Sequence, residues 1–168
     1  MIQKSKIIEN AFLMLGSNDT YNDNKSKEYK IANQLLNKIS VSILGETDFL
    51  FSSITTKLTS IGKNELGEYR FNIPEDFLGI VRAKNLCRLE GEFIFSKASE
   101  LFLQYGRKLP LEEFPAYAEN LLMLGLAKEL SIAISAYNDR YQIIKQQYED
   151  EKTNMLYKIG TQYNAWEE

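Results

Sequence analysis

Residues Tyr69–Leu78 have the sequence YRFNIPEDFL, and they divide the chain into parts of different character. Pro74 fixes its own φ and disfavours the α region for Ile73, so this stretch is predicted to be extended and to enter a turn. Two helical patterns precede the stretch, whereas short extended segments and then a long helical pattern follow it. The chain is therefore expected to place a β region between helical parts.

Apolar residues at helical spacing predict two helices in the N-terminal part of the chain. The first covers residues 7–15 with Gly16 as a stop, and the second covers 29–44 with Gly45 at its end. The polar stretch 17–24 between them is expected to be a loop. The two helices are predicted to form an antiparallel pair.

Between residues 47 and 109 the sequence favours short strands. β-branched and aromatic residues are enriched at 49–61, and further extended segments are expected at 77–83, 93–95 and 101–105. Gly91 and Glu92 mark a turn before the segment at 93–95. The pattern predicts four or five short strands in a small, mostly antiparallel sheet.

After Pro110 the pattern becomes helical again. Residues 116–136 carry few charges, and their leucines and isoleucines cover nearly every direction, which is typical of a helix in the middle of a bundle. A last helix is expected after Asn138-Asp139. The predicted fold class is α+β, mainly α: a helical bundle of residues 1–46 and 110–164, a small antiparallel β insertion at 47–109, and a docking tail at 157–168.

Composition limits the class of protein. The 168 residues are 44% hydrophobic and 26% charged, which is ordinary for a globular protein with a real core. The formal net charge of −3 argues against a protein that grips nucleic acid through a basic face. Cys87 is the single cysteine, so it is predicted to be a small buried thiol in a reducing cytoplasm. We expect neither a signal peptide nor a membrane span.

Catalytic and metal-binding motifs are sparse. The chain contains no histidine, which excludes the Ser-His-Asp arrangement and the common histidine-based zinc site. Gly62-Lys63 resembles the end of a phosphate-binding loop, but Lys57 stands where glycine is needed and Asn64 where Ser or Thr should be. An ordinary turn is the preferred interpretation, and no cofactor or metal is predicted.

Paired carboxylates are the remaining chemical candidates. Three groups could do acid-base work or hold a hard cation if they converged in a cleft: Glu75 with Asp76, Glu112 with Glu113, and Glu149-Asp150-Glu151. Adjacent residues point in different directions, and acidic residues at a helix start favour its dipole without any catalytic purpose. We expect solvated or capping roles and no enzymatic activity, and keep a small carboxylate enzyme as an open alternative.

Aromatic residues suggest contacts with other proteins. Ten tyrosines and nine phenylalanines are many for this length, and aromatic residues are favoured at buried interfaces. Most are expected to pack in the core. Tyr157, Tyr163 and Trp166 lie close to the end of the sequence, where an aromatic tail is interpreted either as a docking segment or as a frayed end.

The order of these features resembles that of one known family. The likeness is carried by YRFNIPEDFL at 69–78, Leu103-Gln104-Tyr105, FPAYAENLL at 114–122, GLAKEL at 125–130, and YEDE at 148–151. In layout it covers nearly the whole chain, and its sharp part is 69–130. The chain resembles the head-to-tail adaptor proteins of short-tailed bacteriophages, also called tail tubular protein A.

This resemblance implies a structural role in a virion, with assembly in the host cytoplasm. It implies a homo-oligomeric ring, usually of twelve copies, that binds the portal protein and receives the tail nozzle and often the tail fibres. DNA would pass through a central channel without being held, and the acidic balance suits such a channel because carboxylates repel phosphates.

Two alternatives remain beside this family. Its members often carry a tryptophan early in the β region, where this chain has Phe49 and Phe51. The smaller connectors of long-tailed phages share the helices and have less β structure. A monomeric intracellular protein-interaction module of similar fold is the other alternative.

Two groups of candidate contact residues are predicted. The C-terminal segment of the family commonly reaches toward the portal, so Tyr157, Tyr163 and Trp166 are predicted to dock there. Contacts between subunits or through loops are predicted for Lys63, Tyr69, Arg70, Arg140 and Lys145.

We expect Leu124→Asp to prevent folding, because an unpaired charge in the middle of an apolar helix should cost several kcal/mol. The measurement is thermal unfolding followed by circular dichroism. A variant that unfolds cooperatively at the temperature of the parent protein would contradict the placement of this helix in the core.

Overall fold

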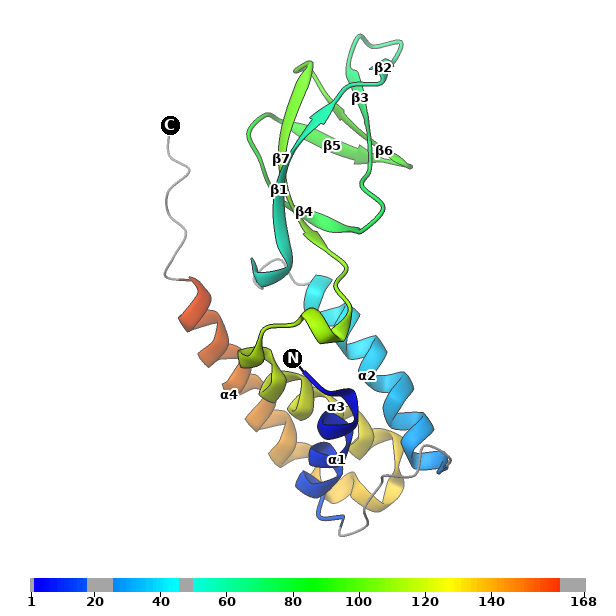
Figure 1. Cartoon of the computed structure of the whole chain (residues 1–168), viewed down its shortest axis with the longest axis vertical. Coiled ribbons are helices and arrows are strands. Elements are labelled where there is room, and N and C mark those ends of the chain that lie inside the picture. Colours follow the sequence, from blue (N-terminus) through cyan, green and yellow to red (C-terminus); the bar gives the residue numbers. More distant parts are fainter. Residues whose placement is uncertain (1, 18–25, 46–49, 161–168) are drawn as a thin grey trace. The chain divides into compact units, whose positions relative to one another are not determined.

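Helices from both ends of the chain form one unit, and strands from its middle form another. The computed structural model describes residues 2–17, 26–45 and 50–160 (Figure 1). The helical unit consists of Met1–Ile43 and Pro110–Glu168, and the β unit consists of Leu44–Leu109.

Four α-helices are described in this chain. They are α1 (Lys4–Met14), α2 (Lys27–Gly45), which belongs to the helical unit as far as Ile43, α3 (Glu119–Ala133) and α4 (Tyr141–Gly160). Short 3-10 segments precede or join them: η2 (Leu111–Glu113), η3 (Ala116–Ala118) and η4 (Ser135–Arg140).

Helix α3 is the common neighbour of the other helices. Both α1 and α4 pack against it, and Leu124 at its centre is only 4% exposed. A Cβ atom added at Gly125 would lie 3.1 Å from Cγ2 of Ile39 in α2 and 3.2 Å from Cε2 of Tyr148 in α4. A glycine at this position therefore lets three helices approach closely. The first two helices, predicted as a pair, are joined by a hydrogen bond from the Lys4 ammonium to the Asn37 side-chain oxygen at 3.0 Å.

The long predicted helix at 116–136 is divided in the structure. Residues Ala116–Ala118 form a 3-10 turn after Pro115, and α3 itself begins at Glu119. The α-helix ends because Ile134 adopts extended angles, with φ −118° and ψ 107°. The break predicted at Asn138-Asp139 thus occurs earlier, and those two residues lie within η4.

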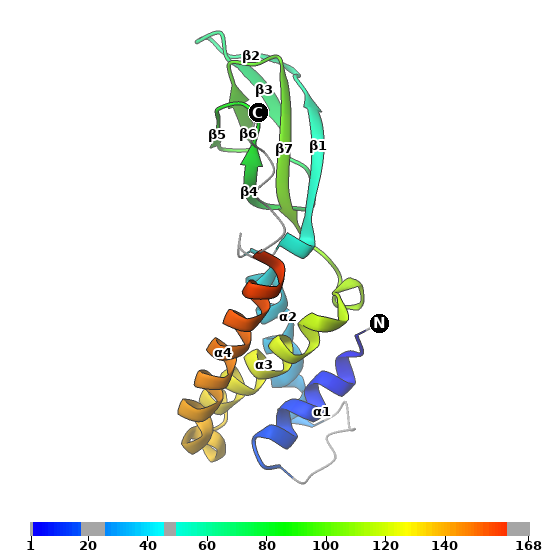
Figure 2. The same cartoon turned by 90° about the vertical axis from the view of Figure 1, so that its left-hand side faces the viewer.

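The β unit contains seven strands in the part that the structure describes. They are β1 (Ser53–Thr59), β2 (Gly62–Lys63), β3 (Tyr69–Asn72), β4 (Phe77–Ala83), β5 (Cys87–Glu90), β6 (Phe93–Ser96) and β7 (Glu100–Arg107), and η1 (Leu50–Ser52) precedes them. They form a three-stranded sheet in the order β1-β7-β4 and a four-stranded sheet in the order β2-β3-β6-β5 (Figure 2). All recorded strand pairs are antiparallel.

The two sheets share one hydrophobic core. Phe71 and Ile94 come from the four-stranded sheet, and Leu101, Leu103 and Tyr105 come alternately from β7. Because side chains alternate along a strand, the intervening residues of β7 belong to the opposite face. The core therefore lies between the inner faces of two short sheets.

The predicted fold class, a mainly α helical bundle with a small β insertion, is wrong. Strands make up 25% of the structure and form two antiparallel sheets, so the chain is α+β with a substantial sheet. The prediction underestimated the strands because β3, β5 and β6 have only four residues each. Segments of that length give too few alternations to be counted from a pattern.

Residues at the end of the stretch 69–78 connect the start of β4 to the end of β7 through hydrogen bonds and a ring contact. A turn closes with the Phe77 amide donating to the Pro74 carbonyl at 3.1 Å. The Tyr105 hydroxyl donates to the Asp76 carboxylate at 2.9 Å, and the Asp76 carbonyl accepts from the Lys108 amide at 2.7 Å. The rings of Phe77 and Tyr105 lie 5.7 Å apart. These contacts give Pro74-Glu75-Asp76-Phe77 a structural role.

The hydrogen bond from Tyr105 predicts a loss of stability at alkaline pH. Burial, followed by this bond to Asp76, raises the pKa of Tyr105. A raised pKa means that the stabilisation is complete below the unfolded value of about 10 and is lost as the pH rises through the folded value. We expect Tyr105→Phe to lower the free energy of unfolding at pH 7 by about 1.5 kcal/mol and to weaken its alkaline decrease.

Urea unfolding from pH 7 to 11 measures this effect. Asp76→Asn and the double variant provide the control, because the two substitutions should be less than additive if their side chains interact. Strict additivity would contradict the bond.

Candidate functional site

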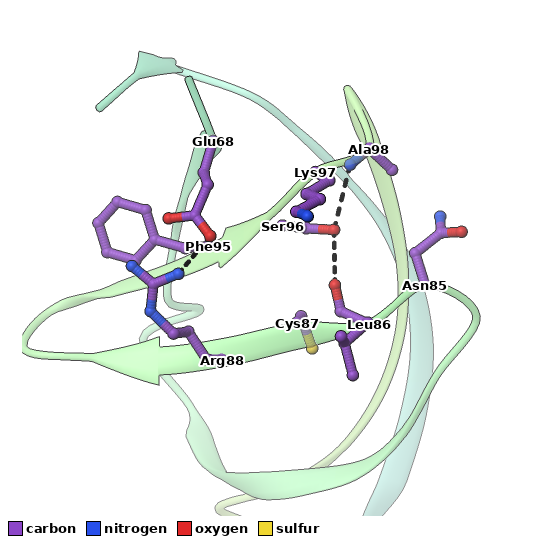
Figure 3. A pocket seen from close by; sticks show the side chains of 9 residues that line it. All are labelled: Glu68, Asn85, Leu86, Cys87, Arg88, Phe95, Ser96, Lys97 and Ala98. Atoms are coloured by element: carbon purple, nitrogen blue, oxygen red, sulfur yellow. Dashed lines mark hydrogen bonds and ion pairs between the residues drawn. The ribbon is translucent and has the colours of Figure 1, made fainter. Parts of the chain in front are cut away.

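A cleft lies at the edge of the four-stranded sheet. Its volume is about 570 Å³, and the lining residues are Glu68, Asn85, Leu86, Cys87, Arg88, Phe95, Ser96, Lys97 and Ala98 (Figure 3). Among the described residues β5 pairs only with β6, so the cleft opens beside an edge strand. The turn between these two strands fixes the register that sets Arg88 opposite Phe95 and Cys87 opposite Ser96.

One wall of the cleft is a fixed ion-pair network. The Arg88 guanidinium lies 5.0 Å from the Phe95 ring centroid, bonds to Glu68, and reaches Glu90 at 3.0 Å. Glu68 also accepts a hydrogen bond from the Asn64 amide nitrogen at 2.9 Å. The hydrogen bonds from Arg88 and then Asn64 lower the pKa of Glu68, and those to Glu68 and Glu90 raise the pKa of Arg88. Both groups therefore stay charged at neutral pH.

The other wall offers no activated nucleophile. The Ser96 hydroxyl donates to the Leu86 carbonyl at 2.8 Å and accepts from the Ala98 amide at 3.3 Å (Figure 3). Cys87 is half-buried, and this burial raises the pKa of its thiol. A thiol held protonated is a poor nucleophile. The cleft is therefore suited to binding, with an anchored ion pair beside an apolar floor.

The predicted turn at Gly62-Lys63 is part of a hairpin. These residues form β2, and the Asn64 side-chain oxygen accepts from the amides of Leu66 at 3.0 Å and Glu68 at 2.9 Å. Those amides are consequently not available to cradle a phosphate. Leu66 at the tip of the loop is 79% exposed.

The structure brings three of the predicted contact residues together in the β unit. Lys63 is opposite Tyr69, with its ammonium 4.4 Å from the tyrosine ring centroid. The Arg70 guanidinium lies 4.8 Å from the ring centroid of Phe93, and Arg70 is opposite Phe95 of the cleft. None of the three predicted residues lines the cleft.

The other predicted contact residues belong to the helical unit. Arg140 lies 4.0 Å from the Asp139 carboxylate, and the Lys145 ammonium lies 6.0 Å from the Tyr141 ring centroid. Tyr157 is 76% exposed near the end of α4. The predicted docking residues Tyr163 and Trp166 lie outside the described residues.

The carboxylate pairs belong to different units. Asp76 is engaged by Tyr105 in the β unit, whereas Glu112 and Glu113 lie in η2 of the helical unit. Among the described residues no cluster of three or more histidine, cysteine, aspartate or glutamate side chains could hold a metal ion. Within the same residues, the helices are all too short or too polar to cross a membrane.

The sequence prediction missed the ion-pair wall of the cleft. Part of its signal was present, because Gly91 and Glu92 mark a turn before the extended segment predicted at 93–95. A two-residue turn pairs Glu90 with Phe93 and therefore Arg88 with Phe95. The contribution of Glu68 could not be found in this way, because it comes from the separate hairpin after β2.

Comparison with known proteins gives no family for this chain. No protein-family model matches it. No curated protein matches it either. The candidate site must be interpreted from its own geometry.

The half-buried thiol predicts slow alkylation in the native protein. Since burial raises the pKa of Cys87, we expect its reaction with iodoacetamide at pH 7 to be at least tenfold slower than in the urea-unfolded chain. The rate should increase as the pH rises above 9. Mass spectrometry of timed samples measures it, and equal rates in the two states would show that the thiol is freely accessible.

Proposed function

We propose that the chain is a structural head-to-tail adaptor of a tailed bacteriophage. Copies of it form a ring between the portal and the tail and leave a channel for DNA. The tail nozzle, and in some virions the tail fibres, attach to the other side of the ring. The protein acts through its surfaces in the mature particle and catalyses no reaction.

The proposal rests on what the resembling residues do. The stretches 69–78 and 103–105 both belong to the sharp part of the resemblance, and they meet where Tyr105 donates to Asp76 at 2.9 Å. Phe71 of the first stretch and Leu103 of the second lie in the same core. A motif that determines packing supports a shared fold, which is what an adaptor role requires.

Exposed apolar side chains support a role in assembly. The helical unit exposes Leu13, Val41, Ile132, Ile143 and Tyr157, and the β unit exposes Ile61, Leu66, Leu86 and Leu89. Leu86 is 94% exposed beside the cleft. These side chains are available for contacts with partners, as the proposed ring requires.

The charges support a channel that lets DNA pass. Arg88 is bound by two carboxylates, Glu68 and Glu90, so it does not offer a free cation to phosphate. The chain as a whole has a net charge of −3. Strong binding to DNA requires several unpaired cations on one face.

An interaction module that works as a monomer is the second candidate. The cleft of about 570 Å³ favours it, because a cleft of this size can bury a side chain or a small ligand of one partner. Mixing the protein with the portal protein of the same phage distinguishes the two candidate functions. Rings of several hundred kilodaltons in light scattering and electron microscopy support the adaptor, and a one-to-one complex supports the module. No association with the portal contradicts the adaptor.

The docking tail gives a sharper prediction. Deletion of residues 157–168 should leave a folded domain, because α3 and its neighbours supply the core, and should weaken binding to the portal. Tyr157→Ala should change the free energy of unfolding by less than about 0.5 kcal/mol, because the side chain is 76% exposed. It should weaken portal binding by about 2 kcal/mol, or roughly thirtyfold.

Gln147→Ala is the matched control, since Gln147 is also exposed on α4 and should leave portal binding unchanged. Surface plasmon resonance on immobilised portal measures both variants. Unfolding of the truncated chain would show that the segment belongs to the core instead.

A further inference from the structure

The outer face of the three-stranded sheet carries an uncompensated positive charge. Lys57 of β1 is opposite Phe102 of β7, and the Lys84 amide, just after β4, bonds to the Phe102 carbonyl. The two ammonium groups lie 5.6 Å and 5.7 Å from the Phe102 ring centroid. We call Lys57, Phe102 and Lys84 the lysine–phenylalanine face.

Only one lysine of this face has a carboxylate partner. Lys57 pairs with Glu100 at 2.6 Å. Lys84 is exposed and makes no ion pair with any residue that the structure describes. Two cations beside one ring with a single carboxylate leave a net positive charge, which favours an anionic partner.

Helix α4 carries exposed carboxylates, together with the exposed Lys145 one turn before Glu149. Glu149 and Asp150 are both exposed near the middle of the helix. Neither forms an ion pair within the described residues, and Asp150 accepts only a hydrogen bond from the Gln146 amide at 2.8 Å. Thr153 and Asn154 on the next turn are also exposed. This surface can therefore offer two carboxylates to a partner.

We infer that the lysine–phenylalanine face of one copy docks against the Glu149–Asp150 surface of α4 in a second copy. This inference rests on the proposed ring and names a contact between its subunits. The two surfaces are different, so each copy uses its lysine–phenylalanine face toward one neighbour and its α4 surface toward the other. This is the heterologous contact that a closed ring needs. The carboxylates lie against the ammonium groups, and Phe102 supplies the apolar centre.

A nucleic acid is the competing partner for a cationic face. Binding to a duplex with strong affinity takes about six to ten phosphate contacts, whereas this face offers two lysines, one of them already paired with Glu100. Two carboxylates on a helix match that small charge better than a phosphate backbone does. The observations thus favour a second copy of the chain.

Charge reversal tests the contact. The variants are Lys57→Glu with Lys84→Glu, Glu149→Lys with Asp150→Lys, and all four substitutions together. Each pair alone should reduce assembly on the portal at least tenfold in light scattering at low salt, and the fourfold variant should recover to within threefold of the parent. Lys30→Glu on α2 changes one exposed charge elsewhere and should leave assembly unchanged.

As a control for correct folding, the thermal unfolding of each variant is measured on the monomer. All four substituted residues are exposed, so the unfolding temperatures should match that of the parent. If one reversed pair were to unfold, a cross-link would replace it: Lys84→Cys with Asp150→Cys in a Cys87→Ser background should give disulfide-linked oligomers on the portal. A disulfide within one chain, or none, would overturn the contact.

The outcomes separate the contact from the proposed function. If the parent protein forms rings and the charge-reversed variants assemble equally well, the contact is overturned and the adaptor role still stands. A parent chain that never assembles on the portal would overturn both. Binding of a labelled oligonucleotide that disappears in Lys57→Glu with Lys84→Glu would assign the face to nucleic acid instead.

Discussion

Neither sheet of the β unit can bury its apolar face without the other. Phe71 and Ile94 on one sheet and Leu101, Leu103 and Tyr105 on the other form a single core. Sheets with strands of four residues have little stability alone, so their mutual burial is the condition for both. The Asp76–Tyr105 bond holds the start of β4 to β7 within the three-stranded sheet.

Helix α3 imposes the same kind of constraint on the helical unit. It is apolar on nearly every side, so it needs neighbours all round, and they come from both ends of the chain. Gly125 permits the close approach of Ile39 and Tyr148. A core closed by both chain ends allows the β unit to be inserted between them without interrupting the packing.

The reactive side chains of the cleft are already engaged or buried. Arg88 is fixed between carboxylates, the Ser96 hydroxyl is engaged by backbone groups, and burial raises the pKa of the Cys87 thiol. What remains is a set of surfaces: a cleft, exposed leucines, and Lys84, Glu149 and Asp150, which make no ion pair with the part of the chain that the structure describes. Such surfaces suit a protein that works by contact with larger partners, as the proposed ring does.

The sequence by itself determined the helical segments, the central place of α3 and the extended stretch before the Pro74 turn, because helical periodicity and proline geometry are local. It did not give seven strands, since four-residue strands show their pattern only when a neighbour fixes the register. Glu68 contacts Arg88, and Lys57 and Lys84 both contact Phe102, across separations of at least 18 residues. Only the tertiary structure decided those contacts, because pairing between distant strands depends on the burial of a shared core rather than on neighbouring residues.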